Sequence, residues 1–271
     1  MKFAQDHRQR VMTGVVGLSI TFLVVGYGSE PIFFVFMLVL NLCALKEFYT
    51  LASVSKISRF LGMALGLALM GGFFYEDAIT LSAFMTGIGF VLCLLNIVKF
   101  NNSEVIECDF KKHVIGIFII TFLLSHLIWL RCLEKGQLWI FFLLAICFSG
   151  DTFAFYGGKL FGKHKLCVKI SPGKTIEGAI VGLIGSVVVG LLCARFFLHG
   201  FSCLAVLFLA IVLGLLGQLG DLWESVLKRE FKVKDSGSCL PGHGGFLDRM
   251  DSLFFATPFL YYFIVFHKGL L

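Results

Sequence analysis

The stretch SCLAVLFLAIVLGLLGQLGDL, residues 202–222, decides the fold class of this chain. A helix needs about 20 mostly apolar residues to cross a bilayer, and this stretch has that length with one charged residue, Asp221, near its end. The whole chain of 271 residues has the same character, with 58% hydrophobic residues, 15% charged residues and a mean hydropathy of +0.92. Soluble domains carry about 25% charged residues. The sequence therefore predicts an all-α polytopic integral membrane protein.

Further stretches of the chain share this length and apolarity. We place the expected transmembrane helices at residues 11–28, 32–54, 59–75, 79–98, 113–130, 137–156, 175–197, 202–222 and 252–267. Lysines and arginines gather in the loops on the side of the N-terminus, and the positive-inside rule places that side in the cytoplasm. We therefore expect about nine spans, a cytoplasmic N-terminus and a multi-pass location in the cell inner (plasma) membrane.

Small residues recur at helix-packing spacing in two of these stretches. They are Gly178, Gly182, Ser186 and Gly190, and then Gly214, Gly217 and Gly220. Small residues let helices approach closely in lipid, so the pattern predicts a tight bundle. We expect residues 1–135 to form N-terminal helices for scaffolding and dimerisation, and residues 136–271 to form a C-terminal catalytic region.

The cysteines and the overall charge exclude some classes of protein. The nine cysteines are scattered singly, without a CxxC pair, which is typical of small buried hydrophobic residues and not of a disulfide framework. The formal net charge of +6 is small and dispersed. We therefore expect no nucleic-acid partner.

Two charged residues lie inside the second expected span. Lys46 and Glu47 come near the end of residues 32–54. An ion pair at the helix end, or snorkelling of the side chains to the interface, explains both of them. A functional role is the alternative, since charges within a membrane often mark functional sites.

The most polar segment is SVLKREFKVKDSGSCLPGHGGFLDRMD, residues 225–251, which lies between two apolar stretches. A membrane protein does not need such a segment merely to fold, so we expect function here. The loop at residues 157–175 is separated from this segment by two spans, which places both loops on the same membrane face. The two loops can therefore form one site.

The start of this segment gives a stripe of polar residues. If the helix of residues 202–222 continues into the cytoplasm, Asp221, Ser225 and Lys228 lie on one face at i, i+4 and i+7, with Arg229 beside them. An acid at membrane depth is expensive and rarely faces lipid. The alternative is that Asp221 only pairs with Lys228 or Arg229 to offset the cost of its burial.

The end of the segment, PGHGGFLDRMD, carries further acids. Asp248 and Asp251 are three residues apart at the expected start of the last span, where carboxylates suit the helix dipole. With Asp221 they would make an oxygen-only site of the kind that Mg²⁺ prefers beside substrate phosphates. The glycines of the turn let backbone N–H groups approach an anion. Bound metal and nearby cations together are typical of phosphoryl or nucleotidyl transfer.

The other loop carries a second candidate site for an anion. In SPGKTIEG, residues 171–178, we expect Ser171 to be a helix N-cap, Pro172 to occupy the first helical position and Lys174 to lie in the first turn. A helix start with a lysine is suited to bind an anion. Upstream lies Asp151, a second acid within a span. A zinc site is the alternative for this region; its ligands would be His164, Cys167, Cys239 and His243.

The segment at residues 225–251 resembles the signature of the integral-membrane phosphatidate cytidylyltransferases, or CDP-diacylglycerol synthases. It has the Ser-x-x-Lys-Arg opening, the Lys-Asp pair at 234–235, the PGHGG turn, and Asp248-Arg249 followed by Asp251. DTFAFYGGKLFGKH and SPGKTIEG resemble the other blocks of that family, so the motifs cover residues 145–255. Gly173 departs from the pattern, because a second lysine is expected there beside Lys174.

The resemblance implies a reaction and a set of roles. CTP and phosphatidate would give CDP-diacylglycerol and pyrophosphate at the cytoplasmic face of the lipid bilayer, with Mg²⁺ and a second cation, K⁺, in a homodimer. Asp221 and Asp248 would bind metal, with Asp251 as the further acid from our own analysis. Asp221, Asp248, Lys228 and Arg229 are the predicted catalytic residues. The predicted substrate-binding residues are Ser225, Lys174, Ser171, Lys163, Lys234, His243, Gly244, Gly245 and Arg249.

Two other functions fit parts of the pattern. A CTP-dependent polyprenol or phytol kinase would transfer a phosphate to an alcohol instead of CMP to a phosphate. An ion-coupled transporter would use Asp151 and Asp221 as ion ligands within the membrane. The concentration of polar residues on one face argues against a transporter, because a pathway needs such groups across the bilayer.

Overall fold

The computed structural model describes residues 2–74, 85, 111–197, 201–233, 236–237, 239 and 244–266, with side chains from residue 12 onward. The chain divides into two compact units, one within Met1–Trp129 and Asp235–Leu247, the other within Leu130–Lys234 and Asp248–Leu271. Each unit is therefore described by itself.

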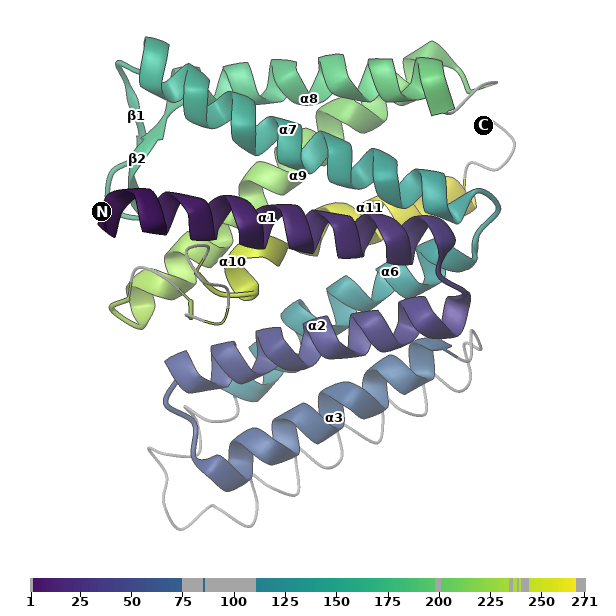
Figure 1. Cartoon of the computed structure of the whole chain (residues 1–271), viewed down its shortest axis with the longest axis vertical. Coiled ribbons are helices and arrows are strands. Elements are labelled where there is room, and N and C mark those ends of the chain that lie inside the picture. Colours follow the sequence, from purple (N-terminus) through teal and green to yellow (C-terminus); the bar gives the residue numbers. More distant parts are fainter. Residues whose placement is uncertain are drawn as a thin grey trace. The chain divides into compact units, whose positions relative to one another are not determined.

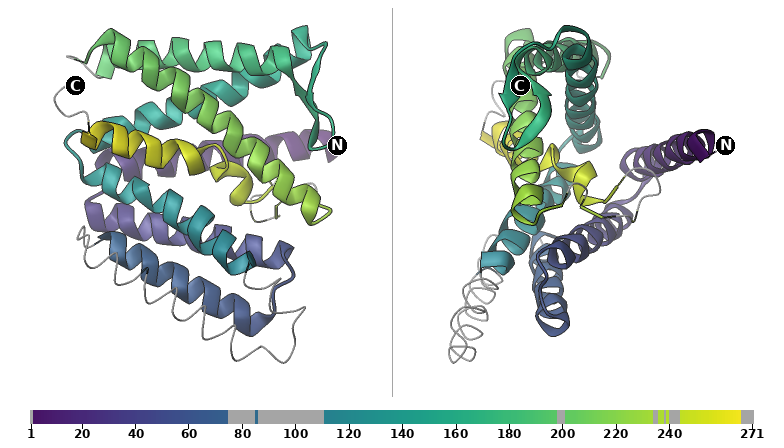
Figure 2. Two further views of the ribbon diagram at one scale, coloured as in Figure 1. Left: turned by 180° about the vertical axis from the view of Figure 1, so that it is seen from behind. Right: turned by 90° about the vertical axis from the view of Figure 1, so that its left-hand side faces the viewer.

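The first unit is built from helices. These are α1 (Lys2–Tyr27), α2 (Glu30–Leu51), α3 (Lys56–Phe74), the π-helical stretch η1 (Ile115–Phe122), and α6 (Leu123–Cys132), which continues η1. The α2 helix packs against both α3 and η1, and α1 also contacts α2 (Figure 2). Large aromatic side chains such as Phe33, Phe48 and Phe73 fill the space between them and are almost fully buried.

A buried polar network fixes the end of α2 in this unit. The His113 ring lies 2.8 Å from the Ser58 hydroxyl and 3.2 Å from the Tyr49 hydroxyl. All three side chains are buried. A Cβ atom at Gly62 would lie 2.5 Å from the Tyr49 hydroxyl oxygen, so the helices approach closely here because this residue has no side chain. The network joins three helical segments and holds the register of α2.

The second unit contains four longer helices, a short helix and a hairpin. They are α7 (Gly136–Phe161), β1 (Lys165–Cys167), β2 (Ser171–Thr175), α8 (Ile176–Phe197), α9 (Cys203–Glu230), the short α10 (Leu247–Met250), which begins at the unit boundary, and α11 (Leu253–Phe266). The α7 and α8 helices pack side by side, and the antiparallel hairpin of β1 and β2 connects their ends (Figure 1). The α9 helix packs against α7, α8 and α11.

The expected close packing of small residues is confirmed in this unit. A Cβ atom at Gly182 would lie 2.8 Å from the Ala154 Cβ atom and 2.8 Å from the Gly150 carbonyl oxygen, both on α7. One at Gly214 would lie 3.0 Å from the Ser186 Cβ atom, which brings α9 onto α8. These contacts fit a bundle whose backbones approach closely in lipid.

Six helical segments in the described ranges are long and apolar enough to cross a membrane. They are α2, α3, Lys111–Cys132, α7, α8 and α9. The apolar part of α1 is shorter, Met12–Tyr27, and α11 has 14 residues. Exposed apolar side chains recur every fourth residue along α8, at Ile176, Ile180, Ile184, Val188 and Leu192, as expected of a surface that faces lipid. The chain is therefore a polytopic membrane protein, and the number of nine spans stays a prediction, since the expected span 79–98 lies outside the described residues.

One local prediction is confirmed and one is wrong. The α9 helix continues without a break to Glu230, as the stripe of polar residues required. The expected helix start at Ser171 and Pro172 is wrong, because residues 171–175 form strand β2. The helix begins at Ile176 instead, where the Thr175 hydroxyl accepts a hydrogen bond from the Gly178 N–H (3.1 Å). Thr175 is itself a good N-cap, so it competes successfully with Ser171.

Candidate active site

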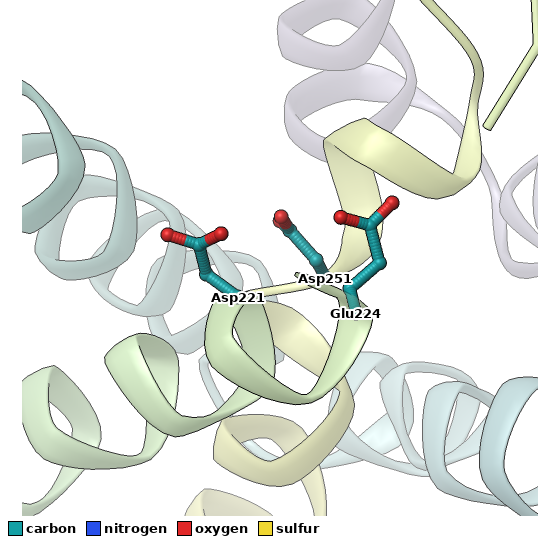
Figure 3. A group of neighbouring side chains, drawn as sticks. All are labelled: Asp221, Glu224 and Asp251. Carbon is teal, nitrogen blue, oxygen red and sulfur yellow. The ribbon is translucent and has the colours of Figure 1, made fainter. Parts of the chain in front are cut away.

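Three carboxylates gather in the second unit. One oxygen from each of Asp221, Glu224 and Asp251 lies within 4.8 Å of the others. Asp221 and Glu224 are three residues apart on α9, and Asp251 lies in the turn that precedes α11. Figure 3 shows the three carboxyl groups on the same side of the α9 helix. Such a group of hard oxygen ligands is what a divalent cation requires.

A glycine allows this approach. A Cβ atom at Gly220 would overlap the carbonyl oxygen of Asp251, so only glycine lets the turn lie directly on α9. The turn is also held from the other side, since the Cys147 Sγ atom donates to the Ser252 carbonyl oxygen at 3.7 Å. The Ser252 N–H donates to Asp251 Oδ1 at 2.7 Å. Asp251 is therefore fixed by backbone packing and by its own neighbour.

The electrostatics of this carboxylate group favour a bound cation. Burial, and after it the charges of Asp221 and Asp151, raise the pKa of Asp251 to about 8. The Glu224 side chain is fully buried, and its carboxyl group is partnered by Lys228 and Asp248. Several acids this close together repel one another when they are ionised. A divalent metal fits these residues because it would be held by hard oxygen ligands and would offset that repulsion.

Two lysines flank the carboxylates. Lys174 Nζ lies 2.6 Å from Asp221 Oδ2. Lys228 Nζ forms ion pairs with Glu224 and, at 2.9 Å, with Asp248 Oδ1. Each lysine thus neutralises part of the acidic charge, and Lys174 also lines the cavity beside Asp221, where it can meet an anionic ligand.

A cavity of about 430 Å³ opens beside Asp221. Its volume falls in the range of about 300–1,000 Å³ that is usual for small-molecule sites. Asp151, Lys174 and Asp221 give it charged walls, and Phe155 and Leu166 give it apolar ones. The cavity therefore suits a ligand with a charged head and an apolar part.

The predicted stripe on α9 has different contacts from those expected. Asp221 forms its ion pair with Lys174 of strand β2. The alternative, in which Asp221 only pairs with Lys228 or Arg229 of its own helix, is therefore wrong. Ser225 is buried. The Arg229 Nε–H donates to the Ile170 carbonyl oxygen at 3.0 Å, which ties the end of α9 to the hairpin.

Glu224 is the residue that the sequence analysis missed. It lies three positions after Asp221, so helical spacing alone places both carboxylates on neighbouring positions of α9. Asp248, which was expected in the metal site, is not in the group of three but lies next to it, where it contacts both Lys228 and Glu224. It lies in the short α10 helix, whereas Asp251 lies beyond its end, so the two acids do not share one helix.

The other predicted residues are placed as follows. Lys163 is exposed and its N–H donates to Glu177 Oε2 at 3.1 Å, and Ser171 lines the cavity. Gly244 has a φ of 80°, and Arg249 is exposed. Gly245 is buried against Ser236 and Glu47 in the first unit. Lys234 and His243 lie outside the described residues.

The zinc alternative gains no support. His164 Nδ1 lies 2.7 Å from Glu177 Oε1, so this ring is engaged by a carboxylate. His243, another of its four ligands, lies outside the described residues. Within the described ranges the group of possible metal ligands consists of carboxylates only.

This site defines a class of protein: an integral membrane protein with a cluster of three carboxylates, two flanking lysines and an amphipathic cavity. The chain belongs to the cytidylyltransferase family, whose model matches residues 8–267. It is 32% identical over 268 residues to the phosphatidate cytidylyltransferase of Bacillus subtilis, covering 96% of this chain and 98% of the relative. The corresponding Staphylococcus epidermidis protein is 35% identical over 257 residues, which cover 93% and 96%. The uncharacterized protein YnbB of Escherichia coli is 34% identical over 255 residues, which cover 92% and 84%. The resemblance noted in the sequence is therefore confirmed.

Proposed function

We propose that this protein is a phosphatidate cytidylyltransferase, which transfers CMP from CTP to phosphatidate and releases pyrophosphate. The observation that carries the proposal is the group of three carboxylates with Lys174 and Lys228 beside it, in a chain of the cytidylyltransferase family. The cavity beside Asp221 supports it, because phosphatidate has a charged phosphate and apolar chains.

The proposed cofactor is Mg²⁺, held by Asp221, Glu224 and Asp251. When bound, it would neutralise negative charge on the phosphate oxygens of CTP. Asp248, in this proposal, acts through Lys228, which it contacts at 2.9 Å. We also propose K⁺ as a second cation, for which Asp151 of α7 and Asp221 of α9, both in the cavity lining, supply carboxylates.

The chain's own residues mainly bind and orient the two substrates. Phosphatidate already has an anionic oxygen, so a general base is not needed and positioning supplies most of the rate. Lys174 and Lys228 bind phosphate groups, and Arg229 holds the hairpin that carries Lys174. The further substrate contacts that we propose are Ser225, Ser171, Lys163, Lys234, His243, Gly244, Gly245 and Arg249.

The proposal includes a membrane arrangement. Nine spans with a cytoplasmic N-terminus place the site at the cytoplasmic face of the plasma membrane, where CTP arrives from solution and phosphatidate from the bilayer. Residues 1–135 form the scaffold of a homodimer, and residues 136–271 form the catalytic region. The excess of lysine and arginine on one side of the chain supports this orientation.

The direct test is turnover by the purified protein in detergent. With radiolabelled CTP, phosphatidate and Mg²⁺, we expect a lipid-soluble labelled product and one pyrophosphate per product. Omission of phosphatidate or Mg²⁺ should abolish it. Release of CDP with a polyprenol or phytol as acceptor would instead identify a kinase. Ion flux into proteoliposomes without CTP turnover would identify a transporter.

A further inference from the structure

Glu47 has surroundings that neither an ion pair nor snorkelling explains. It lies near the end of α2 and is buried, with 5% of its surface exposed, whereas its neighbour Lys46 is exposed. Its Oε2 atom accepts a hydrogen bond from the Leu247 N–H at 3.0 Å and one from the Ser236 hydroxyl at 3.4 Å. The expectation of a helix-end ion pair or snorkelling is therefore wrong for Glu47, because its carboxylate points into the polar segment some 200 residues further along the chain.

Two glycines make room for this carboxylate. A Cβ atom at Gly237 would lie 2.6 Å from Glu47 Oε1. One at Gly245 would overlap both Glu47 Oε2 and the Ser236 hydroxyl. The described parts of the polar segment thus surround the Glu47 carboxylate from two sides, and both sides depend on the absence of a side chain.

The first N–H of α10 is the main group that Glu47 binds. The early N–H groups of a helix have no partner within it, and Leu247 is the first residue of α10. Glu47 therefore holds the N-terminus of α10 from a different helix, and that helix is itself fixed by the network around His113.

The position of α10 matters for the proposed chemistry. The residue that follows Leu247 is Asp248, which contacts Lys228, and Lys228 in turn contacts Glu224 of the carboxylate group. Asp248 follows Leu247 directly in the single turn of α10, so loss of the bond to Glu47 would loosen the turn that orients Asp248. Since misplacement by about 1 Å can cost about 100-fold in rate, a remote holding residue can govern catalysis.

We infer that Glu47 is a positioning residue for CMP transfer, which holds the start of α10 so that Asp248 and Lys228 keep their geometry. This inference rests on the proposed function. Burying a carboxylate is expensive, and Glu47 Oε1 has no hydrogen-bond partner in the described ranges. The two glycines and the bonds at Oε2 show that the polar segment is shaped around this charge.

The first test compares variants of α2 in the turnover assay. Glu47→Ala should lower kcat by about 10- to 100-fold and raise the Mg²⁺ concentration for half-maximal activity. Glu47→Gln keeps an acceptor for the Leu247 N–H and should retain an intermediate kcat, so it also serves if the alanine variant does not fold. Lys46→Ala, on the exposed side of the same turn, is the matched control and should stay at wild-type activity. Wild-type kcat and Mg²⁺ dependence in folded Glu47→Ala would overturn the inference.

The second test does not depend on activity. Hydrogen exchange of the peptide that contains Leu247 should be faster in Glu47→Ala and Glu47→Gln than in the wild type, and unchanged in Lys46→Ala. If the wild-type protein makes no CDP-diacylglycerol but exchange is still faster in the Glu47 variants, the proposed function is refuted and the holding role of Glu47 stands. Unchanged exchange in both Glu47 variants would refute the holding role, whatever the wild-type protein catalyses.

A pair of substitutions tests the contact itself. Gly245→Ala should lower turnover, because the new methyl group overlaps the carboxylate. Glu47→Asp shortens the side chain and should restore part of the turnover of Gly245→Ala. Gly71→Ala, where a Cβ atom has nothing within 4 Å, is the control and should be neutral. Additive losses in the double variant would show that Glu47 and Gly245 do not interact.

Discussion

Lys174 and Asp221 form an ion pair of 2.6 Å that joins strand β2 to helix α9 at the wall of the cavity. The pair links the loop at residues 157–175 to the helix that leads into the polar segment at residues 225–251. It also gives each residue a partner in the absence of substrate. The predictions below follow from this pair and from the carboxylates around it.

Replacing Lys174 should weaken the binding of substrate phosphate. Hydrogen bonds to charged groups contribute about 1.5–3 kcal/mol, so Lys174→Ala should reduce kcat/KM for CTP by roughly 10- to 100-fold. Steady-state kinetics with labelled CTP measures this. Lys169→Ala, an exposed lysine in the turn of the same hairpin, should change kcat/KM less than twofold. Equal losses of kcat/KM in the two variants would show that Lys174 contributes only to the overall positive charge and does not contact the phosphate.

Glu224 should matter for the metal as much as Asp221 does. Glu224→Gln removes one of three clustered carboxylates, so we expect a loss of kcat of about tenfold or more and a higher Mg²⁺ requirement. The Mg²⁺ titration should shift less in Asp248→Asn, because Asp248 is outside the group of three acids and contacts Lys228 and Glu224 instead of the shared ligand position. Glu230→Gln, at the exposed end of α9, is the matched control. A larger shift of the Mg²⁺ titration in Asp248→Asn than in Glu224→Gln would show that Asp248 is a metal ligand.

The pH dependence of Mg²⁺ activation should report Asp251. With a pKa of about 8, this carboxyl group holds a proton at neutral pH when no metal is bound, and Mg²⁺ must displace that proton. Apparent Mg²⁺ affinity should therefore rise as pH increases from 6 toward 8, by up to about tenfold per pH unit. Activation curves at several pH values measure this. Asp251→Asn should flatten the dependence, and a flat wild-type curve would contradict the assignment.

Gly220 should be intolerant of any side chain. A Cβ atom there overlaps the Asp251 carbonyl oxygen, so Gly220→Ala must push the turn away from α9 and separate Asp251 from Asp221. Overpacking of this kind costs about 1–3 kcal/mol, and we expect CMP transfer to fall by about tenfold or more. Gly217→Ala, one turn earlier, places its Cβ atom 3.6 Å from the nearest atoms and should be tolerated. Comparable activity of both variants would disprove the role of this contact.

The sequence predicted those parts of the site that depend on local spacing. Asp221 and the continuation of α9 to Glu230 follow from hydropathy and helical periodicity, and Glu224 was within reach of the same periodicity at three residues from Asp221. The helix start was misplaced, because Thr175 and Ser171 are both good caps and the pairing of β2 with β1 decides between them.

The contacts that remained hidden are those of long range. Nothing in the neighbourhood of Glu47 indicates that its partners are Ser236 and Leu247, since these lie 189 and 200 residues away. The close approach of Asp251 to Gly220 likewise depends on how α11 packs on α9. Such contacts are set by tertiary packing, which a single sequence does not record.

The two lysines that contact the carboxylates have a consequence for how this protein matures. Because Lys174 and Lys228 already balance part of the charge of Asp221 and Glu224, the bundle can assemble in the bilayer before any magnesium reaches it. Under the proposed function, the ion would then exchange with ammonium groups instead of organising an unfolded segment. Chelation of the ion should accordingly abolish activity while leaving the melting temperature nearly unchanged. Readdition of the ion should restore activity without refolding.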